Sequence, residues 1–172
     1  MITSKGDKNM IYRDSLSSYV KKLIENSSND SRLVNQFIAN EKVELYDNIN
    51  NIEDVAKDKD INVIKGIYHR YPNKILIFPT ERCLGSCRFC FRKNIIAEND
   101  LQLQDFDKIE NYILDNKITE VIFSGGDPFA IDEDLLMEMI ERIRNLNTVK
   151  IIRLHTRVLT YNPVSYTHLR AH

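Results

Sequence analysis

The chain is organised around residues 74–90, which read KILIFPTERCLGSCRFC. Residues 75–78 form a continuous apolar run between Pro72 and Pro79, and this run predicts a buried strand. The stretch that follows holds all three cysteines of the 172-residue chain, Cys83, Cys87 and Cys90. Residues 80–93, which we call the cysteine loop, therefore place three closely spaced thiols directly after a predicted strand.

Three thiols in one loop are soft ligands that suit an iron–sulfur cluster or zinc. A structural zinc ion normally takes four ligands, so zinc would need His69, or a residue beyond the end of the chain, as its fourth. A cube of four irons held by three cysteines instead leaves one iron open to a substrate or cofactor. A third interpretation is one buried face of a helix, because free cysteine is a common core residue, but Gly85 and the surrounding arginines disfavour it.

Strands and helices alternate along the chain after the cysteine loop. An apolar stripe that Asp105 could cap predicts a helix, and residues 120–123 predict a second buried strand. Asp132 could cap a further helix, and residues 149–154 predict a third strand. This order predicts right-handed βαβ units and a parallel sheet, whose binding sites lie beyond the carboxyl ends of the strands. Residues 124–128, SGGDP, which we call the glycine loop, are therefore expected at the same edge as the cysteine loop.

Residues 1–65 predict a small helical region that carries no chemistry. Two segments in its first half have apolar residues at helical spacing, whereas residues 41–65 predict short helices and loops. Residues 66–163 are expected to hold the first βα units. Three parallel strands would leave long unpaired edges, so the chain is expected to be a fragment that ends in a non-native tail at residues 164–172.

The composition excludes several classes of protein. The formal net charge is -1 and the acidic and basic residues are interspersed, so neither a nucleic-acid footprint nor a membrane-binding basic patch is expected. No apolar run is long enough for a secretory signal or a membrane span, and a cytoplasmic location is expected. An odd number of closely spaced cysteines argues against a disulfide framework.

The pattern Cys-x-x-x-Cys-x-Phe-Cys after a strand resembles the signature of the radical S-adenosylmethionine (SAM) superfamily. The resemblance implies a 4Fe-4S cluster whose open iron binds the methionyl part of SAM and whose ligands are Cys83, Cys87 and Cys90. It also implies that Phe89 contacts the adenine of SAM. The glycine loop would meet the methionyl amino group, because its glycines allow close approach of the backbone. The loop residues concerned are Ser124, Gly125, Gly126 and Asp127.

A closer resemblance covers about residues 60–163 and is to the lysine 2,3-aminomutase family. Four stretches carry it in order: residues 66–72, the cysteine loop through Arg92, the glycine loop and residues 152–157. The implied fold is α/β, the N-terminal part of a partial (β/α) TIM-like radical SAM barrel preceded by a small helical region. The implied activity moves an amino group from the α to the β carbon of an amino acid. The implied cofactors are a 4Fe-4S cluster, SAM and pyridoxal 5'-phosphate (PLP).

The family resemblance also implies roles for residues outside the glycine loop. Arg70 and Tyr71 would hold the phosphate of PLP, for which a guanidinium fork and a phenol are good donors. Arg92 would pair with the carboxylate of the substrate. His155, Thr156 and Arg157 end the third predicted strand and would contact the ribose or carboxylate of SAM.

Two departures from the family pattern matter. Lys74 stands where arginine is common, which keeps the charge but loses a bidentate donor. The lysine that binds PLP lies in later strands of the family's barrel, so this chain alone is expected to be inactive as an aminomutase. Lysine is the expected substrate, with glutamate, arginine and the lysine of elongation factor P left open because the selecting residues also lie in those later strands.

The expected partners are a small amino acid substrate and an electron donor such as flavodoxin or ferredoxin, with no nucleic acid and no membrane. A homo-oligomer is left open. One alternative function is a radical SAM enzyme of another branch that does not use PLP. Another is a non-catalytic iron–sulfur module for electron transfer, in which the cluster would not respond to SAM.

Overall fold

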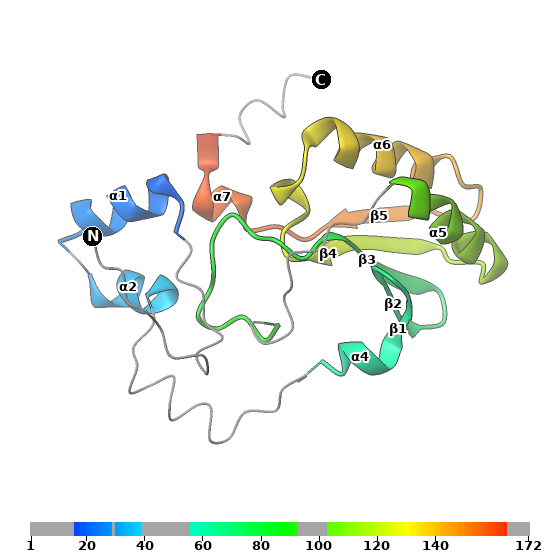
Figure 1. Cartoon of the computed structure of the whole chain (residues 1–172), viewed down its shortest axis with the longest axis horizontal. Coiled ribbons are helices and arrows are strands. Elements are labelled where there is room, and N and C mark those ends of the chain that lie inside the picture. Colours follow the sequence, from blue (N-terminus) through cyan, green and yellow to red (C-terminus); the bar gives the residue numbers. More distant parts are fainter. Residues whose placement is uncertain (1–15, 29, 39–55, 93–102, 165–172) are drawn as a thin grey trace. The chain divides into compact units, whose positions relative to one another are not determined.

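The computed structural model describes residues 16–28, 30–38, 56–92 and 103–164 (Figure 1). Residues 41–55 of the region predicted to hold short helices and loops lie outside the described residues. So do residues 165–172 of the predicted tail. The chain divides into two compact units, and the division after Ala56 precedes the predicted boundary at residue 65.

The first unit, residues 1–56 with residues 85–95, contains two short described helices. Helix α1 is Ser18–Asn26, and the side chain of Ser17 accepts a hydrogen bond from an amide of its first turn. Helix α2 is Ser31–Phe37, and Asp30 caps it in the same way. The two amphipathic helices predicted here are confirmed, and each cap satisfies an amide that the helix itself leaves unpaired.

The second unit, residues 57–84 with residues 96–172, is built on one five-stranded sheet with the order β1-β2-β3-β4-β5. Strands β3, β4 and β5 are parallel, as the sequence predicts, while β1 and β2 run antiparallel to their neighbours. The predicted α/β class is therefore confirmed. The strands are β1 Asn62–Ile64, β2 Ile67–Tyr71, β3 Lys74–Thr80, β4 Glu120–Gly125 and β5 Ile151–Leu154. Short helices are α4 Asp58–Ile61, η1 Pro128–Ala130 and α7 Val158–Tyr161.

Strands β1 and β2 are the part of the sheet that the sequence pattern did not predict, and β1 lies in the region expected to hold only short helices and loops. Strand β2 is five residues long and includes His69 and Arg70, so it lacks the apolar run that identifies β3. The Gly66 carbonyl, just before β2, accepts a hydrogen bond from the Phe78 amide at 2.8 Å. One edge of β3 is therefore covered by β2, and the expectation that the parallel strands stand alone is wrong.

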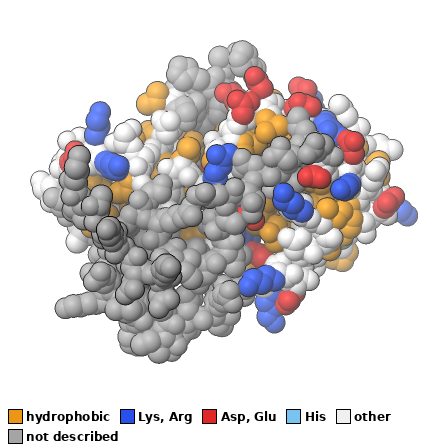
Figure 2. Space-filling model, in the orientation of Figure 1, with side chains coloured by type: hydrophobic (Ala, Val, Ile, Leu, Met, Phe, Trp, Pro, Cys, Tyr) orange, Lys and Arg blue, Asp and Glu red, His pale blue; other side chains and the backbone are white. Residues whose placement is uncertain are grey.

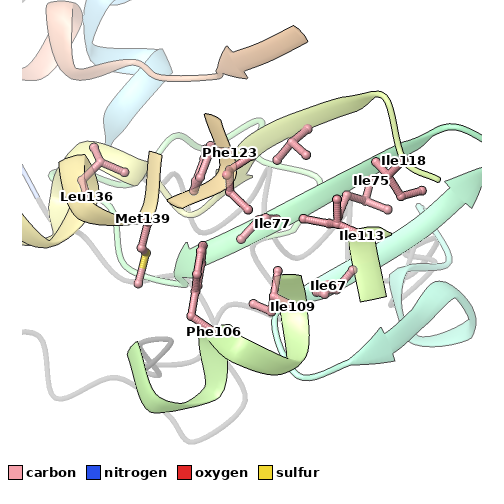
Figure 3. Close-up of a cluster of buried hydrophobic side chains, with 12 residues drawn as sticks. Ile67, Ile75, Ile77, Phe106, Ile109, Ile113, Ile118, Phe123, Leu136 and Met139 are labelled. Atoms are coloured by element: carbon pink, nitrogen blue, oxygen red, sulfur yellow. The ribbon is translucent and has the colours of Figure 1, made fainter. Parts of the chain in front are cut away.

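Helices α5, Leu103–Asp115, and α6, Glu133–Arg144, pack against the same face of the sheet. Alternate residues of a strand point to opposite faces, and Ile75 and Ile77 of β3 point toward the helices (Figure 3). The core is made of Ile67, Ile75, Ile77, Phe106, Ile109, Ile113, Ile118, Val121, Phe123, Leu136, Met139 and Ile143. These contacts hold β3, β4 and their crossover helices together as one layer on another.

The two predicted helix caps have different outcomes. The Asp132 carboxylate accepts a hydrogen bond from the Leu135 amide at 3.2 Å, so the α6 cap is confirmed. Helix α5 begins at Leu103, so Asp105 lies in its first turn, and the prediction that Asp105 caps it is wrong. A carboxylate is favourable at both positions because of the helix dipole, and residue type alone does not separate them.

Charges on the surface follow the even balance of the sequence. On the face that Figure 2 shows, acidic and basic side chains of the described residues are interspersed among apolar patches. None of the described helices is long and apolar enough to cross a bilayer.

Arg142 on α6 joins the two helices above the core. Its guanidinium donates two hydrogen bonds of 2.7 Å to Glu110 on α5 and a third to Asp107. Its Cζ atom also lies 5.2 Å from the centre of the Phe106 ring. The bonds to Glu110 raise the pKa of Arg142 above its ordinary value, so the side chain stays charged.

Near the amino ends of the parallel strands, Glu120 of β4 bridges its two neighbours. Its Oε2 atom lies 3.1 Å from Nζ of Lys74 on β3, and its Oε1 accepts a bond of 2.7 Å from Nε of Arg153 on β5. The bond from Arg153, and then that from Lys74, lowers the pKa of the Glu120 carboxyl below its ordinary value. The lysine that replaces the family's arginine is thus paired within the sheet.

Replacing Arg142 with Met should lower the free energy of unfolding by about 1–2 kcal/mol, because a bidentate pair at a half-buried site is worth more than an exposed one. Arg142→Lys keeps the charge but not the two parallel bonds, and should lose about half as much. Asp107→Asn is the control: the Asp107 side chain is 74% exposed, and its loss should cost less than about 0.5 kcal/mol. Urea unfolding measures all three, and a Met variant as stable as wild type would contradict the prediction.

Glu120 gives the fold a predictable pH dependence. Because its pKa in the folded state lies below the unfolded value of 4.5, its charge stabilises the fold above that pH, and the contribution is lost as the pH falls through the folded-state pKa. Glu120→Gln should therefore be less stable than wild type at neutral pH and lose less stability between about pH 5 and pH 3. Melting temperatures across this range measure the difference. If the melting temperatures of the two proteins fell in parallel as the pH is lowered, Glu120 would not be the cause of the pH dependence.

Candidate functional site

The first residues of the cysteine loop and the glycine loop meet at the carboxyl ends of β3 and β4, as the sequence predicts for parallel strands. Thr80 of β3 is the register partner of Gly125 of β4. Beyond them, the Gly126 amide donates to the Thr80 carbonyl at 3.1 Å and the Asp127 amide to the Arg82 carbonyl at 2.7 Å. Backbone pairing therefore continues past the ends of the strands. It holds residues 80–83, the root of the cysteine loop.

Both glycines are required by this close approach. Gly125 has φ +101°, and a Cβ there would lie 2.6 Å from Cγ of Phe78. A Cβ on Gly126 would lie 2.0 Å from the carbonyl oxygen of Arg82 and 2.6 Å from the carbonyl carbon of Glu81. No side chain fits in either place, so the glycines serve the packing of the two loops whether or not a ligand is present.

Asp127 is buried, with 4% of its surface exposed. Its carboxylate accepts hydrogen bonds from the Phe129 amide at 3.0 Å and the Arg157 amide at 2.7 Å. The hydroxyl of Thr156 donates to the same carboxylate, 2.7 Å from one oxygen and 2.9 Å from the other. Donors of the protein itself thus satisfy this carboxylate.

The end of β5 comes to the same edge. The His155 amide donates to the Phe123 carbonyl of β4 at 2.9 Å, and the Thr156 hydroxyl accepts from the Val158 amide at 2.9 Å at the start of α7. The Cζ atom of Arg157 lies 5.8 Å from the ring of Tyr161, a buried residue of the same helix. The second unit therefore brings Ser124 to Asp127 together with His155 and Arg157, as the family resemblance implies.

The backbone of the cysteine loop excludes the helical interpretation of its cysteines. The described residues from Glu81 to Arg92 form turns and bends, and the Cys90 amide donates to the Cys87 carbonyl at 3.0 Å. Cys83 is exposed, while Cys87 and Cys90 are half-buried. A buried face of a helix would instead show regular helical bonds and buried sulfur atoms.

The donor set fits an iron–sulfur cluster by its chemistry. All three cysteines are thiols on a loop rich in turns, and none is fully buried. Cys83 belongs to the second unit, and Cys87 and Cys90 belong to the first. Across the described residues, no three His, Cys, Asp or Glu side chains converge on a position that could hold a metal ion.

His69 is not a fourth ligand for zinc. Its Nε2 atom lies 2.9 Å from the Tyr71 carbonyl, which can only accept, so Nε2 carries the proton. Its Nδ1 atom then accepts from the Tyr112 hydroxyl of α5 at 2.6 Å, and burial raises the pKa of Tyr112. Both ring nitrogens are occupied and the ring faces α5, so this form of the zinc interpretation is wrong.

Arg70 and Tyr71, the predicted phosphate-binding residues, lie at the other end of the sheet from the glycine loop. Tyr71 is paired with Lys74 where β3 begins, whereas Gly125 is paired with Thr80 where β3 ends. The seven residues of β3 span about 20 Å. One small ligand therefore cannot contact both groups of residues.

In the first unit, the cysteine loop is held by a residue that the sequence pattern did not single out. The Arg88 amide donates to the Gln36 carbonyl at 3.0 Å, and its guanidinium donates to the Asn35 carbonyl at 2.8 Å, at the end of α2. Phe89 next to it is 63% exposed. Arg92 stacks on the Phe91 ring, with its Cζ atom 4.3 Å from the ring centre.

Thr80 was also missed. Thr80 is fully buried, and its hydroxyl accepts from the Arg82 amide at 2.9 Å, which turns the chain into the cysteine loop. Thr80 is the last residue of β3, where threonine is common for its β-propensity alone. The sequence therefore holds no signal that separates Thr80 from an ordinary strand residue.

Comparison with known proteins gives several named relatives. The chain is 30% identical over 162 residues to the L-lysine 2,3-aminomutase of Methanococcus maripaludis, covering 91% of this chain and 37% of that protein. It is 32% identical over 116 residues to the protein of the same name from Haemophilus influenzae, covering 66% and 34%. A third, from Acetoanaerobium sticklandii, is 29% identical over 128 residues, covering 73% and 31%. The chain spans about a third of the length of these relatives.

Residues 77–167 match a protein family that is described as the Radical SAM superfamily. The match covers more than half of the chain and includes the cysteine loop, the glycine loop and the end of β5. These are the segments that the structure joins at one edge of the sheet, apart from the residues of the cysteine loop that belong to the first unit. On the sequence match and the site together, the chain belongs to the radical SAM superfamily.

Proposed function

We propose that this chain is part of a radical SAM aminomutase that moves the α-amino group of an amino acid to the β carbon. L-lysine is the first candidate for that amino acid. The observation that supports this most is the backbone pairing of the cysteine-loop root with the glycine loop, together with the shared name of the relatives. This pairing holds the root of the cysteine loop beside a segment whose backbone can approach a ligand closely.

The roles of the chain's own residues follow from their chemistry. Cys83, Cys87 and Cys90 hold a 4Fe-4S cluster, which together with SAM supplies a one-electron cleavage that yields a 5'-deoxyadenosyl radical. The backbone carbonyls of Gly125 and Gly126 accept hydrogen bonds from the methionyl ammonium. Phe89, whose ring is largely exposed, offers an apolar surface to the adenine. Flavodoxin or ferredoxin is the proposed reductant.

PLP and the substrate are assigned to other residues. Arg70 and Tyr71 donate to the phosphate of PLP at the amino end of β3, and Arg92 pairs with the carboxylate of the amino acid. These donors lie at the other end of β3 from the glycine loop, so PLP would have to extend from its phosphate toward that loop. Hydrogen abstraction requires the amino acid bound to PLP to lie next to the deoxyadenosyl group, so radical formation and amino-group binding have to take place at adjacent positions.

A second candidate is a radical SAM enzyme that does not use PLP. It is favoured by Lys74, whose ammonium lies 3.1 Å from Glu120 and is thereby neutralised within the sheet. A lysine held in this way is a weak donor to a phosphate, since it would have to give up a half-buried partner.

Reconstitution with iron and sulfide under anaerobic conditions should give a 4Fe-4S spectrum, and added SAM should change the electron paramagnetic resonance of the reduced cluster. Cys87→Ala should reduce the iron content to a small fraction of the wild-type value, whereas Ser86→Ala should leave it unchanged. A cluster that ignores SAM would support electron transfer instead, and stoichiometric zinc would contradict both functions.

Phe89→Ala should weaken SAM binding by about tenfold, because an aromatic ring stacked on a base contributes on the order of 1–3 kcal/mol. Phe91→Ala is the matched control, since Phe91 is two residues away and also exposed, at 49% against 63%. Titration of the reduced, reconstituted protein with SAM measures both dissociation constants. Equal values for the two variants would remove Phe89 from the adenine site.

A further inference from the structure

One residue ties together the carboxyl ends of three parallel strands. The Asp127 amide donates to the Arg82 carbonyl in the root of the cysteine loop, after β3. Its carboxylate accepts from the Thr156 hydroxyl and the Arg157 amide, after β5. Asp127 itself follows β4. Loops beyond strand ends are not held by the sheet, so these bonds set where the three segments lie relative to one another.

The side chain that makes these bonds has to be a carboxylate. Each of its oxygens faces an amide donor, Phe129 on one side at 3.0 Å and Arg157 on the other at 2.7 Å. An asparagine has the same shape but presents an NH₂ group to one of these amides, so one donor would lose its partner and meet another donor. At a residue that is 4% exposed, water cannot replace the lost acceptor without opening the loop.

Thr156 links the Asp127 carboxylate to the start of α7. Its hydroxyl has one proton, which is donated to Asp127, and it accepts from the Val158 amide at 2.9 Å. The hydroxyl therefore joins the start of α7 to the glycine loop through Asp127. Thr156 can therefore affect the position of the cysteine-loop root through Asp127, without a direct bond to that root.

We propose that Asp127 is a positioning residue that couples the root of the cysteine loop to the end of β5, and that it acts on SAM binding without touching SAM. The second half of this statement rests on the proposed function. The first half concerns only the protein and can be tested without a cofactor. Through this coupling, Cys83 and Arg157 take up their positions together.

The cofactor-independent test is amide hydrogen exchange in the cysteine-loop root. Thr156→Val should raise the exchange of the Arg82 and Asp127 amides by about tenfold or more, because the coupling reaches the cysteine-loop root through Asp127. Thr156→Ser restores the hydroxyl and should restore slow exchange. Unchanged exchange in the Thr156→Val protein would overturn the coupling. This outcome does not depend on whether the protein binds SAM.

The cofactor-dependent test compares two aspartates that both cap a helical turn. Asp127→Asn should bind SAM about tenfold more weakly after reconstitution, while its iron content stays close to wild type. Asp132→Ala removes the cap of α6 and should lower the melting temperature without changing the dissociation constant of SAM. If both variants weaken SAM binding in proportion to their loss of stability, Asp127 has only a structural role and the proposal is wrong.

A double-mutant cycle tests whether Asp127 and Thr156 affect SAM binding through one coupling or independently. Asp127 and Thr156 act through the same bond. The dissociation constant of SAM for the double variant Asp127→Asn with Thr156→Val should therefore be no higher than the higher of the two single-variant values. Additive losses would overturn the coupling. Should Asp127→Asn fail to fold, Thr156→Val and Thr156→Ser carry the same comparison. A wild-type cluster that ignores SAM, with the exchange results intact, would contradict the proposed function and leave the coupling standing.

Discussion

The contact of Gly126 with the peptide between Glu81 and Arg82 is the constraint on which the rest of the site depends. A Cβ at residue 126 would lie 2.0 Å from the Arg82 oxygen, so β3 and β4 can continue side by side past their ends only because this residue has no side chain. The short bond from the Asp127 amide to the same oxygen follows directly from that approach. Sheet packing by α5 and α6 brings the strands together, and this contact then decides how the loops leave them.

The opposite end of the same three strands is held by a different kind of force. There Glu120 pairs with Lys74 and Arg153, and its bonds are ionic contacts between side chains on adjacent strands. At the site end the bonds involve the backbone and a buried carboxylate with neutral donors. Charged side chains can rearrange without moving the backbone, whereas the bonds at the site end cannot break without moving a loop. The end that carries the cysteines is thus the stiffer of the two by construction.

Periodic features of the fold could be predicted from the sequence. The apolar runs of β3 and β4 and the stripes of α5 and α6 repeat over enough residues to identify their elements, and Asp132 caps α6 as its residue type suggests. Strand β2 was not predicted because it is short and partly polar. The position of Arg70 and Tyr71, at the amino end of β3, was therefore not predicted either. The site was predicted as far as strand order could place it, at the correct edge of the sheet. The contacts of Asp127 with Thr156 and Arg157 could not be predicted, because they join residues about thirty positions apart and leave no local pattern.

The hydrogen bonds of Thr156 have a thermodynamic consequence for whatever binds at this edge. A hydroxyl that donates to Asp127 and accepts from Val158 has one orientation, and the carboxylate beside it has no rotational freedom to lose. The conformational entropy of the glycine loop is therefore lost when the chain folds and not when a ligand arrives. A ligand that meets the backbone of Gly125 and Gly126 finds its acceptors already fixed, and its binding free energy carries no cost of ordering them. Preorganisation of this kind makes the site selective for molecules whose donors match the fixed positions, because the loop cannot adapt to those that do not.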